Sequence, residues 1–282
     1  MALTVIIPVL DEAPHIARCL ASIGTLARRI IVIDAGSTDG TADIASSHGA
    51  EVLFHKWSSD ARQINWAIDT AGITTEWTFL LHADEVVLPP LAARLADLAV
   101  LPDGPLGFTV RRRFHFLGRW LRRGGLYPER TLRLWRTGHG HCEDRLVGTR
   151  MIVHGRAGAI PADIAAIDLH NIGWWTDRQN DHATREALAQ LHDGWPSGAV
   201  GGIPVGIRAP AVTLWRYLVR LGCLDGWEGL VYCVLQTGWF RFLVDIKKRE
   251  VEALMAERQH TLNTVAADEY GIRLIPLGIN GA

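Results

Sequence analysis

The sequence predicts an α/β protein with a mostly parallel sheet flanked by helices. In its first third, short apolar runs alternate with stretches of helical periodicity. Apolar runs of this kind suit strands of a sheet covered on both faces, because such strands never meet water. The repeated strand–helix order then favours parallel strands joined by right-handed crossovers.

The predicted elements follow one another along the chain. We expect strands at 3–7, 30–33, 52–55 and 77–81, and helices at 14–23, 41–48, 61–71 and 90–100. Beyond them come a strand-like segment at 151–155, a helix at 174–191, a Gly- and Pro-rich linker at 196–206 and two apolar helices near 211–223 and 227–247. The last segment, 259–282, is expected to be a loose tail.

Size and charge narrow the class of protein. The 282 residues are 48% hydrophobic, which supplies the core of one large or two modest domains. Lys and Arg (29) nearly balance Asp and Glu (30), so no global field attracts nucleic acid. We therefore expect no nucleic-acid partner, and any electrostatic recognition must come from a local patch.

The spacing of the cysteines and the length of the apolar stretches indicate where in the cell the protein works. The four cysteines lack CxxC-type spacing, so neither a disulfide framework nor a zinc site is indicated. The start, MALTVIIPVL, lacks a positive region and reaches Pro8 too soon for a signal peptide. Residues 229–240 are uncharged but fall short of the roughly 20 needed to cross a bilayer. We expect a cytoplasmic protein that could lie on the inner face of the cytoplasmic membrane.

Acidic residues finish three of the predicted strands. The first strand ends in Pro8, Asp11 and Glu12, the second in Asp34, and the fourth in HADE at 82–85. In open α/β sheets, ligands bind at the carboxyl ends of the strands. GxGxxG after the first strand and GxxxxGK[ST] anywhere are both missing, which argues against dinucleotide and P-loop sites.

The HADE motif has the chemistry of a metal site. Mg²⁺ and Mn²⁺ prefer oxygen ligands and bridge carboxylates to substrate phosphates. Alternation along an extended backbone points His82 and Asp84 to one side and Glu85 to the other. Asp84 is then the better metal ligand, with His82 beside it against the donor or the metal. An alternative is that Asp84 and Glu85 only cap the turn into the next helix.

The IDAGSTDGT segment combines a turn with a carboxylate at a strand end. Asp34 at the mouth of the sheet could accept hydrogen bonds from a nucleobase or ribose. Ser37 to Gly40 fit a tight turn that caps the helix starting near Thr41. For Asp39, capping and a functional role stay open.

An arginine-rich segment, RRRFHFLGRWLRR at 111–123, holds six arginines in thirteen residues. Interleaved aromatic residues give it the composition of a nucleic-acid surface, but no nucleic-acid motif accompanies it. An anionic glycolipid acceptor needs the same bidentate cations, and we favour it, with Arg122 and Arg133 as contacts. A solvated basic hairpin is the alternative for Arg111 to Arg113.

The C-terminal helical segment, 207–258, is apolar nearly all round before it turns basic at 247–249. Such helices pack in a core, press against lipid or pair with another subunit, and all three uses stay open. The Trp174–Trp175 pair could stack on acceptor sugar rings, with Trp175 as the expected contact, or could be core.

These motifs together resemble the family 2 glycosyltransferases of GT-A fold. The ordered motifs are PVLDE, VIDAGSTDGT, a Q-x-N helix and HADE. LGRWLRRGG, YPER and the WWT helix make the chain more specifically similar to the bacterial branch with lipopolysaccharide-core β-1,4-glucosyltransferases and related polysaccharide-assembly enzymes. The resemblance covers about residues 2 to 250 and implies a Rossmann-like GT-A domain with C-terminal apolar helices.

The resemblance also implies a role for each matching segment. Residues 1–105 would be the nucleotide-sugar-binding half and 106–195 the half with the acceptor site and catalytic base. Pro8, Asp11 and Glu12 would line the nucleotide pocket, Asp34 would hold the base, Arg62, Gln63 and Asn65 would approach the base or diphosphate, and Asp84 would bind Mn²⁺ or Mg²⁺. Asp144 would be the catalytic base, with Glu143 as the second candidate.

Three departures from the family pattern matter. Leu10 stands where many relatives have an aromatic residue, Asp11 replaces the usual Asn, and His82 replaces the first Asp of DxD. With one carboxylate instead of two, metal affinity could fall, and His82 could serve the ribose instead.

The resulting hypothesis is an inverting, metal-dependent glycosyltransferase. It would move a sugar from a nucleotide-diphosphate donor, with UDP-glucose as the first candidate, to a lipid-linked or lipopolysaccharide-type glycan and form a β-linkage. The alternatives are a sugar nucleotidyltransferase and a non-catalytic subunit that binds nucleotide sugar as a scaffold. Residues 8–14 lack the Gly-rich, basic loop that the nucleotidyltransferase would need.

Overall fold

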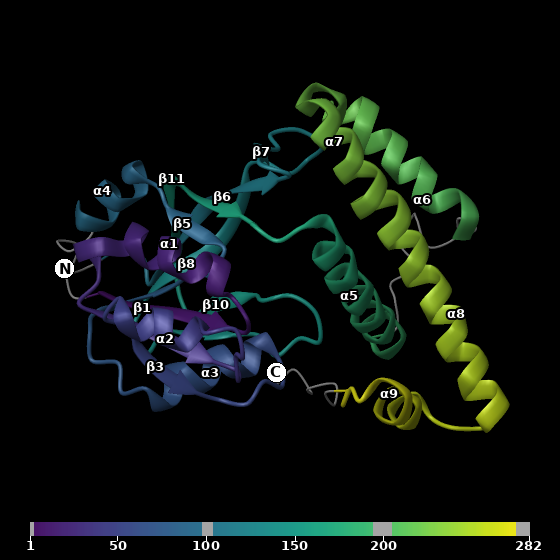
Figure 1. The fold of residues 1–282 in the computed structure, drawn as a ribbon, viewed down its shortest axis with the longest axis horizontal. Helices are drawn as coiled ribbons and strands as arrows, with labels where there is room; N and C mark the ends of the chain where they lie inside the picture. Colours follow the sequence, from purple (N-terminus) through teal and green to yellow (C-terminus); the bar gives the residue numbers. More distant parts are fainter. Residues whose placement is uncertain (1–2, 98–103, 194–204, 275–282) are drawn as a thin grey trace. The chain divides into compact units, whose positions relative to one another are not determined.

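The computed structural model describes residues 3–97, 104–193 and 205–274 (Figure 1). The chain separates into two compact units. Unit 1 comprises Met1–Arg122, Leu126–Asp144 and Gly148–Leu169, and unit 2 comprises Arg123–Gly125, Arg145–Val147 and His170–Ala282. The linker expected at 196–206 lies, up to residue 204, outside the described residues.

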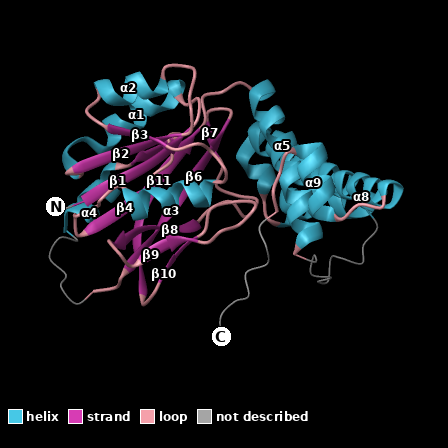
Figure 2. Ribbon diagram, turned by 90° about the horizontal axis from the view of Figure 1, so that it is seen from below, coloured by secondary structure: helices cyan, strands magenta, loops and turns pink. Residues whose placement is uncertain are grey.

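Unit 1 is built on one large sheet (Figure 2). Its strands are β1 (Leu3–Val9), β2 (Arg29–Asp34), β3 (Glu51–Phe54), β4 (Trp77–Leu80), β5 (Glu85–Val87), β6 (Gly107–Phe116), β7 (Arg119–Trp120), β8 (Glu129–Arg136) and β11 (Ala157–Ile167). They are ordered β3-β2-β1-β4-β8-β6-β11-β5, and β7 pairs with β6. A separate hairpin joins β9 (Gly140–Cys142) to β10 (Met151–Val153).

The strand directions bring the carboxyl ends of six strands to one edge of the sheet. β3, β2, β1 and β4 are mutually parallel. β8 runs antiparallel to both β4 and β6, so β6 points the same way as β4, and β11 is parallel to β6. The carboxyl ends of β1, β2, β3, β4, β6 and β11 therefore meet at one edge, called here the carboxyl edge. The predicted α/β class and GT-A arrangement are confirmed, with parallel pairing on the β3–β4 side and mixed pairing beyond it.

Helices cover both faces of this sheet. They are α1 (Ala13–Ile23), α2 (Thr41–Ser47), α3 (Asp60–Thr70) and α4 (Pro89–Asp97), close to their predicted bounds. Val5 and Ile7 of β1 pack in one core cluster with α1, α2 and α4, whereas Ile6 packs in a second cluster with α3. Because successive side chains of a strand point to opposite faces, one apolar strand supplies both clusters.

Unit 2 is helical. Its elements are α5 (Ile172–His192), α6 (Val205–Leu214), the π-helical η3 (Trp215–Val219), η4 (Gly222–Asp225), α7 (Gly226–Tyr232), the π-helical η5 (Cys233–Trp239), α8 (Phe240–Arg258) and α9 (Leu262–Tyr270). α5 packs on α8 through Ala183, Ala187 and Val244. Within the described residues, no helix is long and apolar enough to traverse a bilayer.

The segment expected to be a loose tail contains a helix. The side chain of Thr261 caps α9 by accepting a hydrogen bond from Thr264 N. Val265 and Ala266 are fully buried in a cluster with Val251 of α8. Capping and burial together order this short helix, which its length alone would not stabilise.

Candidate active site

The structure brings the acidic strand ends together. Pro8 to Glu12 follow β1, Asp34 ends β2, and His82 and Asp84 follow β4. All of these strands finish at the carboxyl edge, since β1 is parallel to both β2 and β4. The edge therefore carries the residues that were predicted to bind the donor and the metal.

The loops after β1 and β2 are tied to each other. Asp11, with a left-handed φ of 53°, accepts a hydrogen bond from Thr38 N at 2.7 Å through Oδ1. Its own N–H donates to Ser37 Oγ at 2.9 Å. Asp39 accepts from the backbone N–H groups of Ala13 and Thr41. Asp39 thus anchors the starts of α1 and α2, which supports the capping interpretation.

Asp34 is nearly buried beneath these loops. Its side chain is 7% exposed, and Oδ1 accepts hydrogen bonds from Ser37 N (3.0 Å) and Ser37 Oγ (2.5 Å). Gln63 of α3, which is 2% exposed, donates from Nε2 to Ile33 O. Its observed role is to hold the end of β2, so a substrate contact of Gln63 is not supported by its burial.

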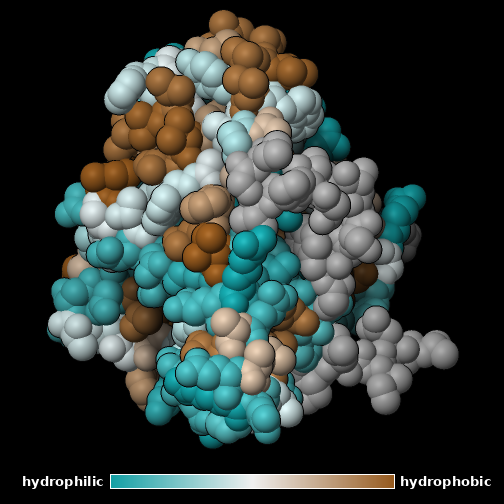
Figure 3. Space-filling view, turned by 90° about the vertical axis from the view of Figure 1, so that its right-hand side faces the viewer, coloured by the Kyte–Doolittle hydropathy of each residue, from teal (hydrophilic) through white to brown (hydrophobic). Residues whose placement is uncertain are grey.

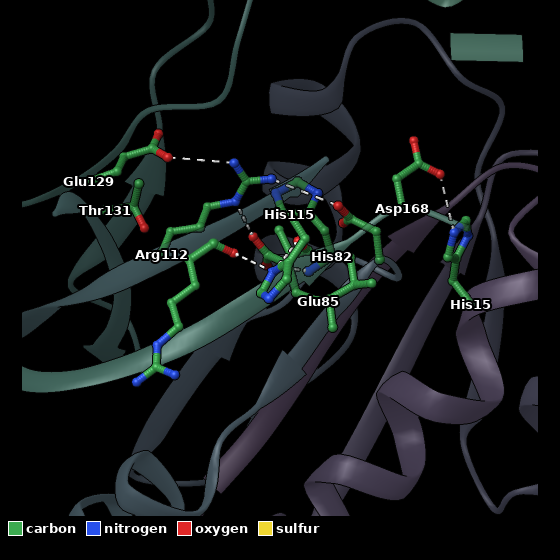
Figure 4. Close-up of polar contacts among 12 residues, drawn as sticks. His15, His82, Glu85, Arg112, His115, Glu129, Thr131 and Asp168 are labelled. Carbon is green, nitrogen blue, oxygen red and sulfur yellow. Dashed lines mark hydrogen bonds and ion pairs between the residues drawn. The ribbon is translucent and has the colours of Figure 1, made fainter. Parts of the chain in front are cut away.

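His82 to Glu85 form a turn, closed by the Glu85 N–H to His82 O bond of 3.0 Å, where an extended backbone was expected. Glu85 is fully buried, whereas His82 and Asp84 are half-buried. Glu85 Oε2 also accepts the N–H of His82 at 2.9 Å (Figure 4). Glu85 therefore has a structural role within the turn, and Asp84 is the more exposed of the two acids.

Two arginines neutralise Glu85 and one of them reaches Asp84. Arg112 Nε lies 2.9 Å and Arg133 Nη2 2.7 Å from Glu85 Oε1. Arg112 also lies 3.7 Å from Asp84 and 3.5 Å from Glu129 (Figure 4). A buried carboxylate requires such partners, because removing a charge from water is costly unless it is paired.

The pKa directions distinguish the three groups of the motif. Burial opposes ionisation of Glu85, but the guanidinium groups of Arg133 and Arg112 outweigh it and lower its pKa to about 2. Burial, together with the neighbouring Glu85 charge, raises the pKa of Asp84. Burial and then Arg133 lower the pKa of His82, which favours a neutral ring. Glu85 is a fixed structural anion, and Asp84 is the carboxylate that a cation would stabilise.

These residues fit a divalent cation. Asp84 offers carboxylate oxygens, and the neutral ring of His82 offers a nitrogen. Mn²⁺ and Mg²⁺ accept few protein ligands and complete their shell with substrate phosphates and water. These residue types suit such an ion.

Asp144 is held at the same edge through α3. Arg62 Nε donates to Asp144 Oδ2 at 3.2 Å. Arg62 lies in the first turn of α3, which begins where the chain returns from the carboxyl end of β3. Asn65, one turn further on, pairs with both main-chain groups of Cys142, at 2.8 Å each. The loop with Glu143 and Asp144 is thus fixed to the helix beside the carboxyl edge.

The family assignment rests on a match over more than half of the chain. Residues 4–154 match the family Glycosyl transferase family 2. The chain belongs to glycosyltransferase family 2. This match includes β1 to β4, the HADE turn and the Glu143–Asp144 loop, so all the residues described above lie inside it.

Relatives of this family 2 chain include two curated proteins. A TPR repeat-containing protein of Synechococcus elongatus is 31% identical over 66% of this chain and 45% of its own length. The lipopolysaccharide core biosynthesis glycosyltransferase LpsC of Rhizobium meliloti is 29% identical over 50% of this chain and 53% of its own. The chain thus spans about half the length of these curated relatives. Among solved structures, S. aureus TarS 1–349 is similar with a TM-score of 0.44 at 14% identity, covering 89% of this chain and 92% of TarS.

The arginine-rich segment of this family 2 chain is largely neutralised in the fold. Arg111 and Arg113 pair with Asp163 of β11 at 2.8 and 2.6 Å, and Arg112 pairs with Glu85. Asp163 is 4% exposed and therefore needs these partners. The interpretation of residues 111–113 as an acceptor patch is corrected accordingly: these arginines compensate buried acids. No sequence spacing reveals Asp163, because it lies on a neighbouring strand.

Arg122 and Arg133 have different positions. Arg133 is 6% exposed and pairs with Glu85 of the HADE turn, so its observed role is structural, and its substrate contact stays a prediction. Arg122 is exposed, and its guanidinium carbon lies 4.1 Å from the ring centroid of Trp120, a cation–π contact. Arg122 stays a predicted acceptor contact.

The tryptophan pair of α5 is also resolved. Trp175 is 9% exposed, which does not favour stacking on a sugar ring. Trp174 is half-buried and stacks on His170, with ring centroids 3.6 Å apart. The acceptor contact of Trp175 stays a prediction.

Further edge residues were missed by sequence reasoning. Asp168 directly follows β11 and lies 3.3 Å from Nε2 of His15 in α1 (Figure 4). His15 Nδ1 lies 2.7 Å from Glu12. Asp168 is an acid at the end of a strand, which is the same signal that the other edge residues gave. It was missed because β11 was not predicted as a strand.

Proposed function

We propose that this chain is an inverting glycosyltransferase that uses a nucleotide-diphosphate sugar and requires Mn²⁺ or Mg²⁺. The observation that supports the proposal is the ion pair of Arg62 with Asp144 in a family 2 chain whose fourth strand is followed by Asp84. The donor is proposed to be a UDP-sugar, with UDP-glucose as the first candidate. Pro8, Asp11, Glu12 and Asp34 would line its nucleotide site.

Charge determines the mechanism. The departing nucleotide diphosphate gains negative charge in the transition state, so it must be neutralised where it forms. Asp84 and His82 would hold the divalent ion, which when bound acts as a Lewis acid on the diphosphate. Arg62, 49% exposed, can add a guanidinium to the same phosphates.

Asp144 would serve as the general base. A sugar hydroxyl is a weak nucleophile, so a carboxylate within hydrogen-bond reach must take its proton as the glycosidic bond forms. Asp144 is 37% exposed and is oriented by Arg62. A single displacement of the nucleotide inverts the anomeric centre, which gives a β-linkage from an α-linked donor.

The acceptor is proposed to be a lipid-linked or lipopolysaccharide-type glycan at the inner face of the cytoplasmic membrane. The likeness to LpsC, a lipopolysaccharide core biosynthesis glycosyltransferase, supports this class of acceptor. The exposed Arg122 on its tryptophan is a suitable contact for a phosphate on such an acceptor.

A second candidate is a scaffold that binds nucleotide sugar without turnover. The observation in its favour is His82, which removes one carboxylate from the metal site. The two candidates predict opposite results for the parent chain supplied with donor and acceptor, because only an enzyme transfers the sugar.

The test is sugar transfer from a panel of UDP-sugars to lipopolysaccharide-core acceptors, with and without Mn²⁺, for the parent chain and Asp144→Asn. We expect metal-dependent transfer that falls by about 10²-fold or more in the variant, with nucleotide binding retained. Tight nucleotide binding by the parent without any turnover would favour the scaffold. Pyrophosphate release from a nucleoside triphosphate would favour a nucleotidyltransferase.

A further inference from the structure

Unit 2 exposes a cluster of apolar side chains where its helices reverse direction. Val219 and Trp227 are 66% and 68% exposed, although residues of their types are usually buried. The cluster is called here the turn patch. Its members are Leu214, Trp215, Leu218, Val219, Leu221, Leu224 and Trp227. Figure 3 shows apolar side chains gathered at the top of this face, over the end of unit 2 where α6 and α7 meet.

The backbone of the turn leaves no room for these side chains inside. A Cβ atom on Gly229 would lie 2.5 Å from Gly222 O, and one on Gly222 would lie 3.1 Å from Arg216 O. Leu221 is in the left-handed region, with φ 57°. The two arms of the turn are therefore packed backbone to backbone, and the apolar side chains must project outward.

The exposed charges on this turn are positive. Asp225 is 5% exposed and accepts the backbone N–H of Arg123 at 2.7 Å, and Glu228, next to Trp227, is half-buried. Arg220 is exposed, with its guanidinium carbon 5.4 Å from the ring centroid of Trp215. Arg123 is exposed as well. The fully exposed charged side chains at the rim of the apolar surface are thus arginines.

An apolar groove adjoins the turn patch. It is an open groove of about 490 Å³ between α6, η5 and α8, lined by side chains that include Pro210, Val234, Trp239 and Phe242. Leu214 belongs to both the groove lining and the turn patch. The two features therefore form one continuous apolar surface.

We propose that the turn patch inserts into the interfacial region of a lipid bilayer that contains anionic lipids. Leucine and valine side chains gain from leaving water, and tryptophan rings favour the depth of the headgroups. Arg123 and Arg220 would reach phosphate groups while their stems follow the apolar surface. The adjoining groove can accept part of an acyl chain.

The charge distribution favours lipid over a second copy of the chain. A two-fold interface brings the same patch of both subunits together. The fully exposed Arg123 and Arg220 would then face their copies, whereas Asp225 is buried and already bonded and Glu228 is half-buried. An anionic lipid surface supplies the missing counter-charges.

The test is co-flotation of the full chain with vesicles, without donor or acceptor, so that its outcome is independent of the proposed transfer. Vesicles of phosphatidylcholine alone are compared with vesicles that also contain phosphatidylglycerol. The parent is expected to bind the anionic vesicles. The double variant Val219→Glu, Trp227→Glu should bind at least about tenfold more weakly, because two inserted side chains become charged.

A matched control is available in unit 1. Phe54 on β3 is 66% exposed, so Phe54→Glu makes the same change at an equally exposed apolar site. It should leave vesicle binding unchanged, and Arg220→Glu should abolish the preference for phosphatidylglycerol. Circular dichroism checks that each variant is folded.

Three outcomes would overturn the proposal. The parent could fail to bind anionic vesicles, or the double variant could bind as well as the parent. The third is a halved mass of the double variant in light scattering, which would show that the turn patch joins two copies of the chain.

Discussion

Arg62 holds Asp144 in an ion pair of 3.2 Å, which links the proposed diphosphate contact to the proposed catalytic base. Both side chains are partly exposed, at 49% and 37%, so the pair itself adds little stability. Its value is positional, because a general base must be aimed at the hydroxyl that it deprotonates.

The first prediction concerns this pair. Arg62→Gln should lower kcat/KM for sugar transfer by about 10–100-fold, since Asp144 loses its orienting partner and the diphosphate loses a cation. Steady-state kinetics with varied donor measures the effect. The matched control is Arg29→Gln, which breaks the pair with Glu51 at the start of β2, away from the carboxyl edge, and should leave transfer unchanged. Equal losses in both variants would contradict a role specific to Arg62.

The second prediction concerns Asn65, which acts on the base through the backbone. Asn65→Ala removes both hydrogen bonds to Cys142. The buried N–H of Cys142 then loses Asn65 Oδ1 as its acceptor. We expect about 1–3 kcal/mol less free energy of unfolding and a fall in kcat with little change in donor KM. Urea titration and transfer kinetics measure the two effects. The control is Thr70→Ala on the same helix, whose hydroxyl bonds only within α3. A changed donor KM with an unchanged kcat would argue that Asn65 contacts the donor directly.

The third prediction concerns the buried anion beneath the HADE turn. Glu85→Gln leaves Arg112 and Arg133 facing a neutral group in a site that is 0% exposed. Breaking a buried ion pair in this way should cost about 3–5 kcal/mol of the free energy of unfolding. Urea titration measures it.

The control for this prediction is an exposed pair. Glu51→Gln breaks the contact with Arg29, where Glu51 is 45% exposed, and should cost no more than about 1 kcal/mol. If Glu85→Gln costs as little as Glu51→Gln, the arginines do not depend on Glu85.

The fourth prediction concerns pH and Asp39. Burial opposes ionisation of this group, but the Thr41 hydroxyl and the backbone N–H groups of Ala13 and Thr41 outweigh it and lower its pKa. A lowered pKa in the folded state means that the stabilisation is complete above the ordinary value of 3.8 and is lost as the pH falls through the folded value.

Asp39→Asn should therefore be less stable than the parent near neutral pH, with the difference shrinking below the ordinary value of 3.8. Urea titrations at a series of pH values measure it, with Asp69→Asn on the exposed surface of α3 as the control. A difference that stays constant down to strongly acidic pH would show that the carboxylate charge is not what anchors the two helices.

The β3–β4 side of the sheet could be predicted because its signals are local. The strand and helix bounds from β1 to α4 follow from apolar runs, periodicity and turn residues that lie next to each other in the chain. The different burial of Asp84 and Glu85 was expected from an extended backbone, but it arises in a turn, which the sequence reasoning did not predict. The helix at Leu262–Tyr270 was missed because a short helix depends on a cap and on burial against α8.

The sequence by itself determined the α/β order, the acidic strand ends and the residue types that a metal and a general base require. The tertiary structure decided which charged residues are free to act. Asp163 and Glu85 pair with arginines that look like a basic surface in the sequence. Arg62 of α3 holds Asp144, which lies in the loop after β9. The physical reason is that electrostatic partners are chosen by distance in space, and the strand order that brings β6, β8 and β11 together is not a local property of the chain.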